Sequence, residues 1–393
     1  MKFISLTSTA EDEWDVVNDL TCKLATDNLA CLVCYCTEEY DASRLRDFLV
    51  NRFPSLPIQG CSTCKGVMTE KGFEEGPVVG ILAVYDSGIN AYGTGICEFS
   101  DHISDSVTNA IDLALNNADR CGEVPELILL HSTPGHEEAV LNAIDQKFGT
   151  LVPIIGGSAA DNKVANRWSV FTEQAYSTNA VSLTLFFASQ SIYTSLSAGH
   201  APTCHMGIAT KVSGRVLLEI DGKPATKVYH GWTQEHVKDD KDNYLFERAT
   251  IYPLGRYVGS DLARPYFKLS HPIRETAEQG IEVFTDIKEG DQVYLMSGCK
   301  EQLVSRAADI IRASYYEGVE LEEKLGGISI FCAGPMIYLK QDMQQVCNRI
   351  NQALDGQPFI CPFTFGEQGR LCGGESAHGN LMVSSATFYR LKV

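Results

Sequence analysis

The residues best suited to hold a bound molecule lie near the end of the chain. Residues 359–365 place Phe, Cys, Phe and Phe at alternate positions, which indicates a β-strand. Residues 366–382 then combine five glycines with charged and amide side chains. Glycine lets the backbone turn sharply or approach a ligand closely. Such a loop can hold a charged group and an amide against a small molecule, and the candidate ligand-binding residues in it are Gly366, Glu367, Gln368 and Asn380. The alternative interpretation is a solvated hairpin loop.

Three segments of the chain share the plan strand, turn, amphipathic helix and proline-started strand, namely residues 29–62, 126–158 and 328–363. The apolar residues of each helix recur at i, i+3 and i+4, so one stripe can pack on a sheet. Ligands bind at the carboxyl ends of strands in open α/β sheets. The loops that end these units are therefore expected to converge on one concavity. This adds further candidate ligand-binding residues: Ser62, Thr63, Ser158, Asp161 and Cys332. Alternatively, the small residues only let helices approach the sheet.

The order of elements predicts the fold class. Further helices are expected at residues 11–28, 102–118 and 302–317, and hairpin-like stretches at residues 76–97, 168–197 and 281–296. We predict an α/β protein with two mixed-sheet domains, built from repeated strand–helix–strand units and hairpins. A length of 393 residues agrees with two domains. Small residues and a proline interrupt the pattern near residue 200, so the predicted domains are residues 1–200 and 201–393.

Composition and charge exclude several classes of function. The chain has 32 basic and 50 acidic residues, a net charge of −18, which disfavours binding to nucleic acid or to anionic lipid. Its apolar stretches are far shorter than the ~20 residues of a membrane span. The first residues turn acidic before any signal-like apolar core develops, so we expect a cytoplasmic protein. The chain has no Walker A or G-x-S-x-G motif, and we expect no enzymatic activity.

Fourteen cysteines raise the possibility of a metal site. They are scattered through a large chain without a secretory signal, so a disulfide framework is not expected. Cys61 and Cys64 have a spacing that is compatible with metal binding. A metal or iron–sulfur cluster would draw on a wider set: Cys61, Cys64, Cys332, Cys361 and Cys372. The alternative is that these residues pack as small hydrophobic side chains, the usual role of buried cysteine.

The motifs, taken in order, resemble the FIST family of sensory domains. The first half is similar to the FIST N region at residues 60–63 and 153–161. The second half is similar to the FIST C region at several short segments: residues 219–225 with Tyr229, 252–254, 289–291, 331–334, and a terminal T-F-G-E segment at 364–367 followed by an asparagine-led strand. The resemblance covers roughly residues 25–388. It implies a small-ligand sensor that feeds a signal-transduction partner, often a histidine kinase.

A narrower resemblance is to FIST proteins that bind haem and sense nitric oxide. It is carried by residues 269–272, 276–278, 332–334, 366–369 and 378–382. It implies haem as cofactor, with His271 as the first candidate for the iron ligand and His131 as the second, because imidazole is the usual proximal ligand. Either histidine can instead be a hydrogen-bonded structural residue. The alternatives for the whole chain are a cysteine-centred metal or redox sensor, and a module that binds an amino acid or metabolite without haem.

Overall fold

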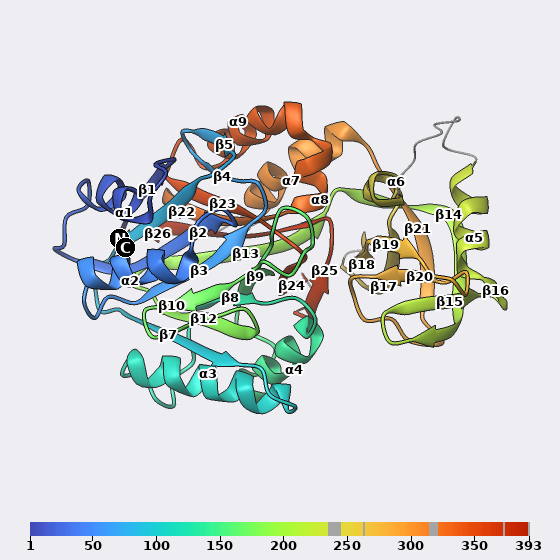
Figure 1. The fold of residues 1–393 in the computed structure, drawn as a ribbon, viewed down its shortest axis with the longest axis horizontal. Coiled ribbons are helices and arrows are strands. Elements are labelled where there is room, and N and C mark those ends of the chain that lie inside the picture. Colours follow the sequence, from blue (N-terminus) through green and yellow to red (C-terminus); the bar gives the residue numbers. More distant parts are fainter. Residues whose placement is uncertain (235–244, 262–263, 314–320, 372–373, 392–393) are drawn as a thin grey trace.

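The computed structural model describes residues 1–234, 245–261, 264–313, 321–371 and 374–391, and Cys372 lies outside them. These residues form a mixed α/β fold with several mixed sheets, which confirms the predicted class. Figure 1 shows a larger body and a smaller body side by side. Residues 1–198 and 300–391 build the larger body, and residues 200–298 build the smaller one. Among the described residues, no helix combines the length and apolar character needed to cross a membrane.

The first sheet of the larger body contains the first strand–helix–strand unit. Its strand order is β1 (Lys2–Ser8), β6 (Val79–Tyr85), β2 (Leu29–Thr37), β3 (Ile58–Thr63), β10 (Val170–Thr172) and β11 (Tyr176–Ser177). Strands β2 and β3 are parallel. Helices α1 (Glu13–Thr21) and α2 (Ala42–Arg52) cover its outer face through an apolar cluster that includes Leu20, Leu45 and Leu49.

The second sheet contains the second unit, with β8 parallel to β9. Its order is β25 (Ser376–Gly379), β24 (Glu367–Arg370), β9 (Ile154–Ser158), β8 (Leu127–Ser132), β12 (Ala180–Phe187) and β7 (Ala91–Glu98). Helices α3 (Ile103–Asn117) and α4 (Glu137–Phe148) cover its outer face, with Ile111 and Ile144 buried in the contact. The glycine-rich end of the chain thus adds two strands to a sheet built mostly from the first half.

The third sheet contains the third unit, with β22 parallel to β23. Its order is β13 (Ser191–Ala198), β26 (Met382–Leu391), β22 (Leu321–Cys332), β23 (Phe359–Thr364), β4 (Gly66–Thr69) and β5 (Gly72–Glu75). The helices on its outer face are α7 (Lys300–Ala313), α8 (Ala333–Tyr338) and α9 (Met343–Ala353), with a short 3-10 turn at Lys340–Asp342. All three predicted strand–helix–strand units are therefore confirmed.

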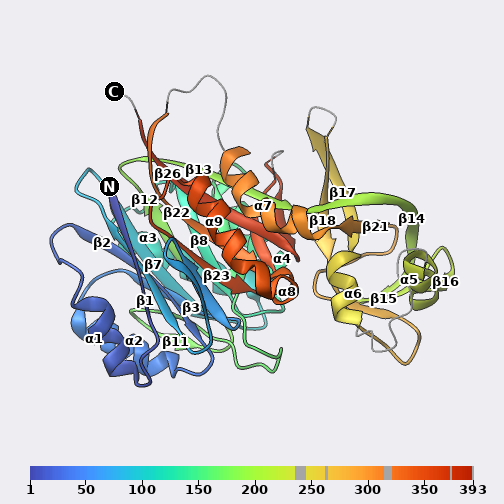
Figure 2. The ribbon, with the colours of Figure 1, turned by 90° about the horizontal axis from the view of Figure 1, so that it is seen from above.

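The inner faces of the three sheets share one core, and the helices lie outside it (Figures 1 and 2). Val33 of the first sheet, Leu129 of the second and Ile330 of the third belong to one cluster of buried apolar side chains. Each of these strands is apolar on both faces, because its outer face packs on helices. Burial of both faces explains why the sequences of these strands are continuous apolar runs rather than alternating ones.

In its described residues, the smaller body consists of a sheet of eight strands and two helices. Its order is β18 (Arg264–Ser270), β17 (Leu254–Asp261), β21 (Gln292–Gly298), β14 (His200–Ser213), β15 (Val216–Ile220), β20 (Ile281–Val283) and β19 (Pro272–Glu275), and β16 (Lys223–Pro224) pairs with β15. The helices are α5 (Ala225–Gln234) and α6 (Leu245–Ile251). The residues after 300 return to the larger body, so both bodies contain residues from the second predicted domain.

Two of the expected hairpins are wrong. Strands β6 and β7, within residues 76–97, belong to the first and second sheets and pair with other strands. Strands β20 and β21, within residues 281–296, also have separate partners. Residues 168–197 do contain one hairpin, β10 with β11. Apolar patterning identifies a strand, but the partner of a strand that is buried on both faces depends on the packing of whole sheets.

Candidate functional site

The three small-residue loops meet in space through direct hydrogen bonds. The backbone N–H of Ala160 donates to the carbonyl of Ser62 at 3.0 Å. The N–H of Phe365 donates to the carbonyl of Ser158 at 3.0 Å, and the N–H of Ser158 donates to Gly366 at 3.0 Å. The loops therefore contact one another directly, and these backbone N–H and carbonyl groups form hydrogen bonds between the loops.

Several predicted ligand residues are tied into this junction. The hydroxyl of Thr63 donates to the carbonyl of Gly66 at 2.8 Å and accepts from the N–H of Phe363 at 2.8 Å. The carboxylate of Asp161 accepts from three backbone N–H groups of its own loop, those of Lys163, Ala165 and Arg167. These contacts fold the loops rather than present free groups to a ligand.

Ser62 lies at a separate, polar hollow of the larger body. Its hydroxyl accepts from the N–H of Ser169 at 2.9 Å. The hollow is formed by the ends of β2 and β3 and by residues 167–178, with Glu38 and Arg167 paired across it. The loop residues expected around one concavity therefore border two different hollows.

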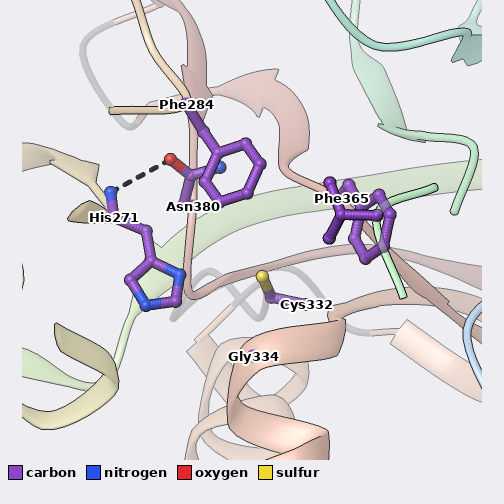
Figure 3. Close-up of a pocket in the computed structure, with 7 residues that line it drawn as sticks. His271, Phe284, Cys332, Gly334, Phe365 and Asn380 are labelled. Carbon is purple, nitrogen blue, oxygen red and sulfur yellow. Dashed lines mark hydrogen bonds between the residues drawn. The ribbon is translucent and has the colours of Figure 1, made fainter. Parts of the chain in front are cut away.

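A mostly apolar pocket lies between the two bodies (Figure 3). Its lining residues from the smaller body are His271 and Phe284, and those from the larger body are Val164, Cys332, Gly334, Phe365 and Asn380. It contains about 290 Å³ of space that no atom fills, with the open solvent at its mouth included. The enclosed part is only about 20 Å³, far below the roughly 300–1,000 Å³ of usual small-molecule sites, so a ligand larger than a water molecule requires the pocket to open. The pocket brings together three residues that the sequence singled out: His271, Cys332 and Asn380.

His271 is held at the pocket by the junction between β18 and β19. It follows β18 directly and precedes Pro272, and only 2% of it is exposed. Its backbone N–H donates to the side-chain oxygen of Asn380 at 3.2 Å, and its ring lies tilted beside Phe284, with centroids 6.0 Å apart. The imidazole approaches α8 at Gly334, where a β-carbon would lie 3.6 Å from its Cε1 atom. The ring is thus placed between an aromatic wall and a glycine (Figure 3).

Glu367 lies beside Cys332 and is completely buried. Its Oε1 accepts from the hydroxyl of Thr364 at 2.9 Å, and its Oε2 accepts from the N–H of Met382 at 3.1 Å. Burial raises the pKa of Glu367 well above its ordinary value, and these hydrogen bonds offset only part of that effect. Burial likewise raises the pKa of the Cys332 thiol. Both groups are therefore favoured in their neutral forms.

Gln368 and Ser158 belong to a buried polar group at the start of α4. The amide of Gln368 donates to the hydroxyl of Ser158 at 3.0 Å, and that hydroxyl donates to Glu137 at 2.9 Å. Gly366 next to it has a φ of +114°, and a β-carbon there would lie 2.4 Å from the ring of His378. These predicted residues thus contact the second sheet itself, including His378 of β25.

His131 lies away from the pocket, in the core of the second sheet. Its Nδ1–H donates to the carbonyl of Gly157 at 2.8 Å, and its Nε2 accepts from the hydroxyl of Tyr35 at 2.9 Å. Burial lowers the pKa of His131 to about 4. Both ring nitrogens are occupied, which is the arrangement of a neutral structural histidine.

Cys61 and Cys64 contribute to different hydrophobic clusters, the shared core and the cluster beneath α7 and α9. Burial raises the pKa of Cys61 well above its ordinary value and that of Cys64 to about 12. Thiolates are the form that binds metals. Burial therefore disfavours the thiolate at both positions, and the charge of Lys65 offsets only part of this effect at Cys64.

Sequence reasoning missed two aromatic walls of the pocket, Phe284 and Phe365. Phe365 stands at the start of one of the loops expected around a concavity, but its alternation with Phe363 indicates a strand residue rather than a ligand contact. Phe284 follows β20 in a stretch that reads as an ordinary hairpin, so nothing in the sequence marks it. Its position matters only because the two bodies meet there.

The chain is a mixed α/β protein with a small, mostly apolar pocket between two bodies. Residues 30–223 match the FIST N domain, and residues 225–370 match the FIST C domain. Together the matches cover most of the chain, which belongs to the FIST family, whose domains generally sense small ligands in signalling proteins.

A curated relative comes from an archaeon. The uncharacterized protein MJ1623 of Methanocaldococcus jannaschii is similar to this chain, with 25% identity over 315 residues. The aligned region covers 72% of this chain and 57% of that protein. The chain thus spans a little over half the length of this relative.

Proposed function

We propose that this chain is a cytoplasmic sensor that binds a small ligand in the pocket around His271 and reports to a signal-transduction partner without catalysing a reaction. The observation that carries the proposal is the shared lining of the pocket. His271 and Phe284 come from the smaller body, and Cys332, Phe365 and Asn380 come from the larger one. A ligand between them contacts both bodies at once.

The shared lining suggests how binding produces a signal. A ligand shifts an equilibrium between two arrangements only if it binds one of them more tightly. A molecule held between Phe284 and Phe365 has different contacts whenever the bodies move relative to each other. A partner that binds one arrangement better then responds to the ligand, and a histidine kinase is the partner that the family resemblance favours.

Haem is the ligand that the narrower resemblance favours, and the pocket fits it in part. The buried imidazole of His271 beside Phe284 suits an axial ligand of iron. The enclosed space of about 20 Å³ holds no more than a water molecule, so haem binding requires the bodies to separate at Phe284 and Phe365. A bound haem would supply an iron that binds nitric oxide. His271 would hold it, and the aromatic walls would exclude water.

The test is titration of the purified full chain with haem, followed by its absorption spectrum. We expect an intense Soret band that His271→Ala weakens or shifts. His102→Ala is the matched control, because His102 is an exposed histidine on the larger body. Failure to bind haem, or binding that both variants share equally, would contradict the haem version.

A parallel thermal-shift series with amino acids and related metabolites tests the sensor without haem. Stabilisation that Phe284→Ala removes would place a metabolite in the same pocket. If His271→Ala and Phe284→Ala leave the binding of haem and of every tested metabolite unchanged, the pocket is not a sensory site. The effect of the ligand on autophosphorylation of a candidate histidine kinase then tests the partner.

A further inference from the structure

His378 is a buried histidine whose ring has no hydrogen-bond partner. It lies in β25, and only 2% of it is exposed. Neither Nδ1 nor Nε2 has a hydrogen-bond partner in the structure. Buried polar side chains are nearly always hydrogen-bonded, and an exception calls for an explanation such as a bound ion. This ring faces two carboxylates: one ligand atom each of Glu137, Glu138 and His378 lie within 4.8 Å of one another.

The two carboxylates are held so that one oxygen of each is directed to a common point. Oε1 of Glu137 accepts from the hydroxyl of Ser158 at 2.9 Å and from the N–H of Gly135 at 3.0 Å. Oε1 of Glu138 accepts from the N–H of Asp286 at 2.8 Å. The remaining Oε2 atoms both contact one nitrogen, Nη2 of Arg215, at 2.8 Å and 2.7 Å.

Three carboxylates surround one arginine at this point. Glu137 is buried and Glu138 is half-buried, and both contact the guanidinium of Arg215, which also contacts Asp286. Arg215 is thus an arginine paired with both carboxylates that face His378.

We propose that Glu137, Glu138 and His378 form a binding site for a divalent transition-metal ion such as Zn²⁺, which replaces the guanidinium nitrogen of Arg215. Two carboxylate oxygens and one imidazole nitrogen suit a borderline ion, with water completing the coordination. Mg²⁺ and Ca²⁺ prefer oxygen ligands throughout. Ser158 and Gly135 orient Glu137 as hydrogen-bond donors behind a metal ligand do.

The exchange has a consequence for the arrangement of the two bodies. Arg215 lies in the turn between β14 and β15 of the smaller body, whereas Glu137 and Glu138 begin α4 of the larger one. A metal that displaces Arg215 removes this ion pair between the bodies. Asp286, which contacts both Glu138 and Arg215, lies two residues from the pocket residue Phe284. The metal site is thus a second input, which does not depend on a ligand at His271.

The experiment is titration of the purified full chain with Co²⁺, a coloured substitute for Zn²⁺, followed by competition with Zn²⁺. We expect one bound ion with visible absorption bands and without the ultraviolet bands of cobalt–thiolate bonds. His378→Ala, or His378→Gln if the first variant does not fold, should weaken binding by more than about 10-fold. His102→Ala should leave binding unchanged, since that histidine is exposed elsewhere on the larger body.

Two substitutions of Arg215 separate competition from simple support of the fold. Arg215→Gln removes the competing charge and should tighten Co²⁺ binding by about 5-fold or more. Arg215→Lys keeps the charge and should bind no more tightly than the wild type. No Co²⁺ binding, thiolate bands, binding that His378→Ala leaves intact, or equal affinities in the two Arg215 variants would each overturn the proposal. Haem and metabolite binding at His271 are measured separately and are not affected by these outcomes.

Discussion

The side-chain oxygen of Asn380 accepts a hydrogen bond from the backbone N–H of His271 at 3.2 Å, and this bond joins the two bodies at the edge of the pocket. The backbone extends the contact, because the N–H of Asn380 donates to the carbonyl of Leu269 at 3.0 Å. Asn380 also lines the pocket itself. A substitution of Asn380 therefore alters both the lining of the pocket and the hydrogen bond between the bodies.

Asn380→Ala should lower the free energy of unfolding by about 1–3 kcal/mol, because a buried hydrogen bond between the bodies is lost. It should also weaken ligand binding at the pocket. Chemical denaturation and ligand titration measure the two effects. Asn18→Ala, at an exposed position of α1, is the control. Equal stability of the two variants would show that the Asn380 bond contributes little.

Gly366→Ala should destabilise the protein by about 1–3 kcal/mol, the usual cost of a strained backbone, and crowding adds to this cost. Its φ is +114°, and the new β-carbon would lie 2.4 Å from Cε1 of His378 and 3.0 Å from the amide nitrogen of Asn380. Gly122→Ala is the matched control, since its φ is +87° and no atom lies within 4 Å of a β-carbon there. Thermal denaturation of both variants isolates the crowding. Similar decreases in stability of the two variants would mean that the side chains of His378 and Asn380 move aside at little cost.

Glu367→Gln should remove a pH-dependent loss of stability. The folded protein raises the pKa of Glu367, so between the ordinary value of 4.5 and the folded value the folded state binds more protons than the unfolded state. The contribution of Glu367 to the free energy of unfolding is largest below pH 4.5. It decreases as the pH rises above 4.5, by up to about 1.4 kcal/mol per pH unit. Denaturation at several pH values should show a smaller decline in the variant. A decline unchanged by Glu367→Gln, or reproduced by Glu278→Gln at the surface, would contradict this expectation.

His131 should make the protein less stable in acid. Its pKa falls from 6.5 to about 4 on folding because the ring is buried, so the unfolded state binds more protons in that range. Stability therefore decreases as the pH is lowered from 6.5 towards 4, and His200 contributes in the same window because burial lowers its pKa to about 4 as well. His131→Gln should flatten the decrease in denaturation experiments. The same slope in wild type and variant would show that His131 is already protonated or that its ring is solvated.

Much of the fold could be predicted because local patterns specify it. Each strand–helix–strand unit combines an apolar run, an amphipathic helix and a second apolar run, and all three units form parallel strand pairs. The expected hairpins at residues 76–97 and 281–296 failed for the complementary reason. A turn signal shows where a strand ends, whereas its hydrogen-bond partner can come from any part of the chain.

The candidate site divides in the same way. The sequence by itself determined the strand at residues 359–364 and that His271 follows an apolar strand, because alternation is a local property. The loop expected at residues 366–382 is wrong in part, since residues 367–370 and 376–379 are the strands β24 and β25, paired in the second sheet. Only the tertiary structure decided that His271 meets Asn380 and Phe284 at a pocket, and that Glu137, Glu138 and His378 face Arg215. These contacts join residues from two bodies, and their distances depend on how whole sheets pack, which no spacing along the chain records.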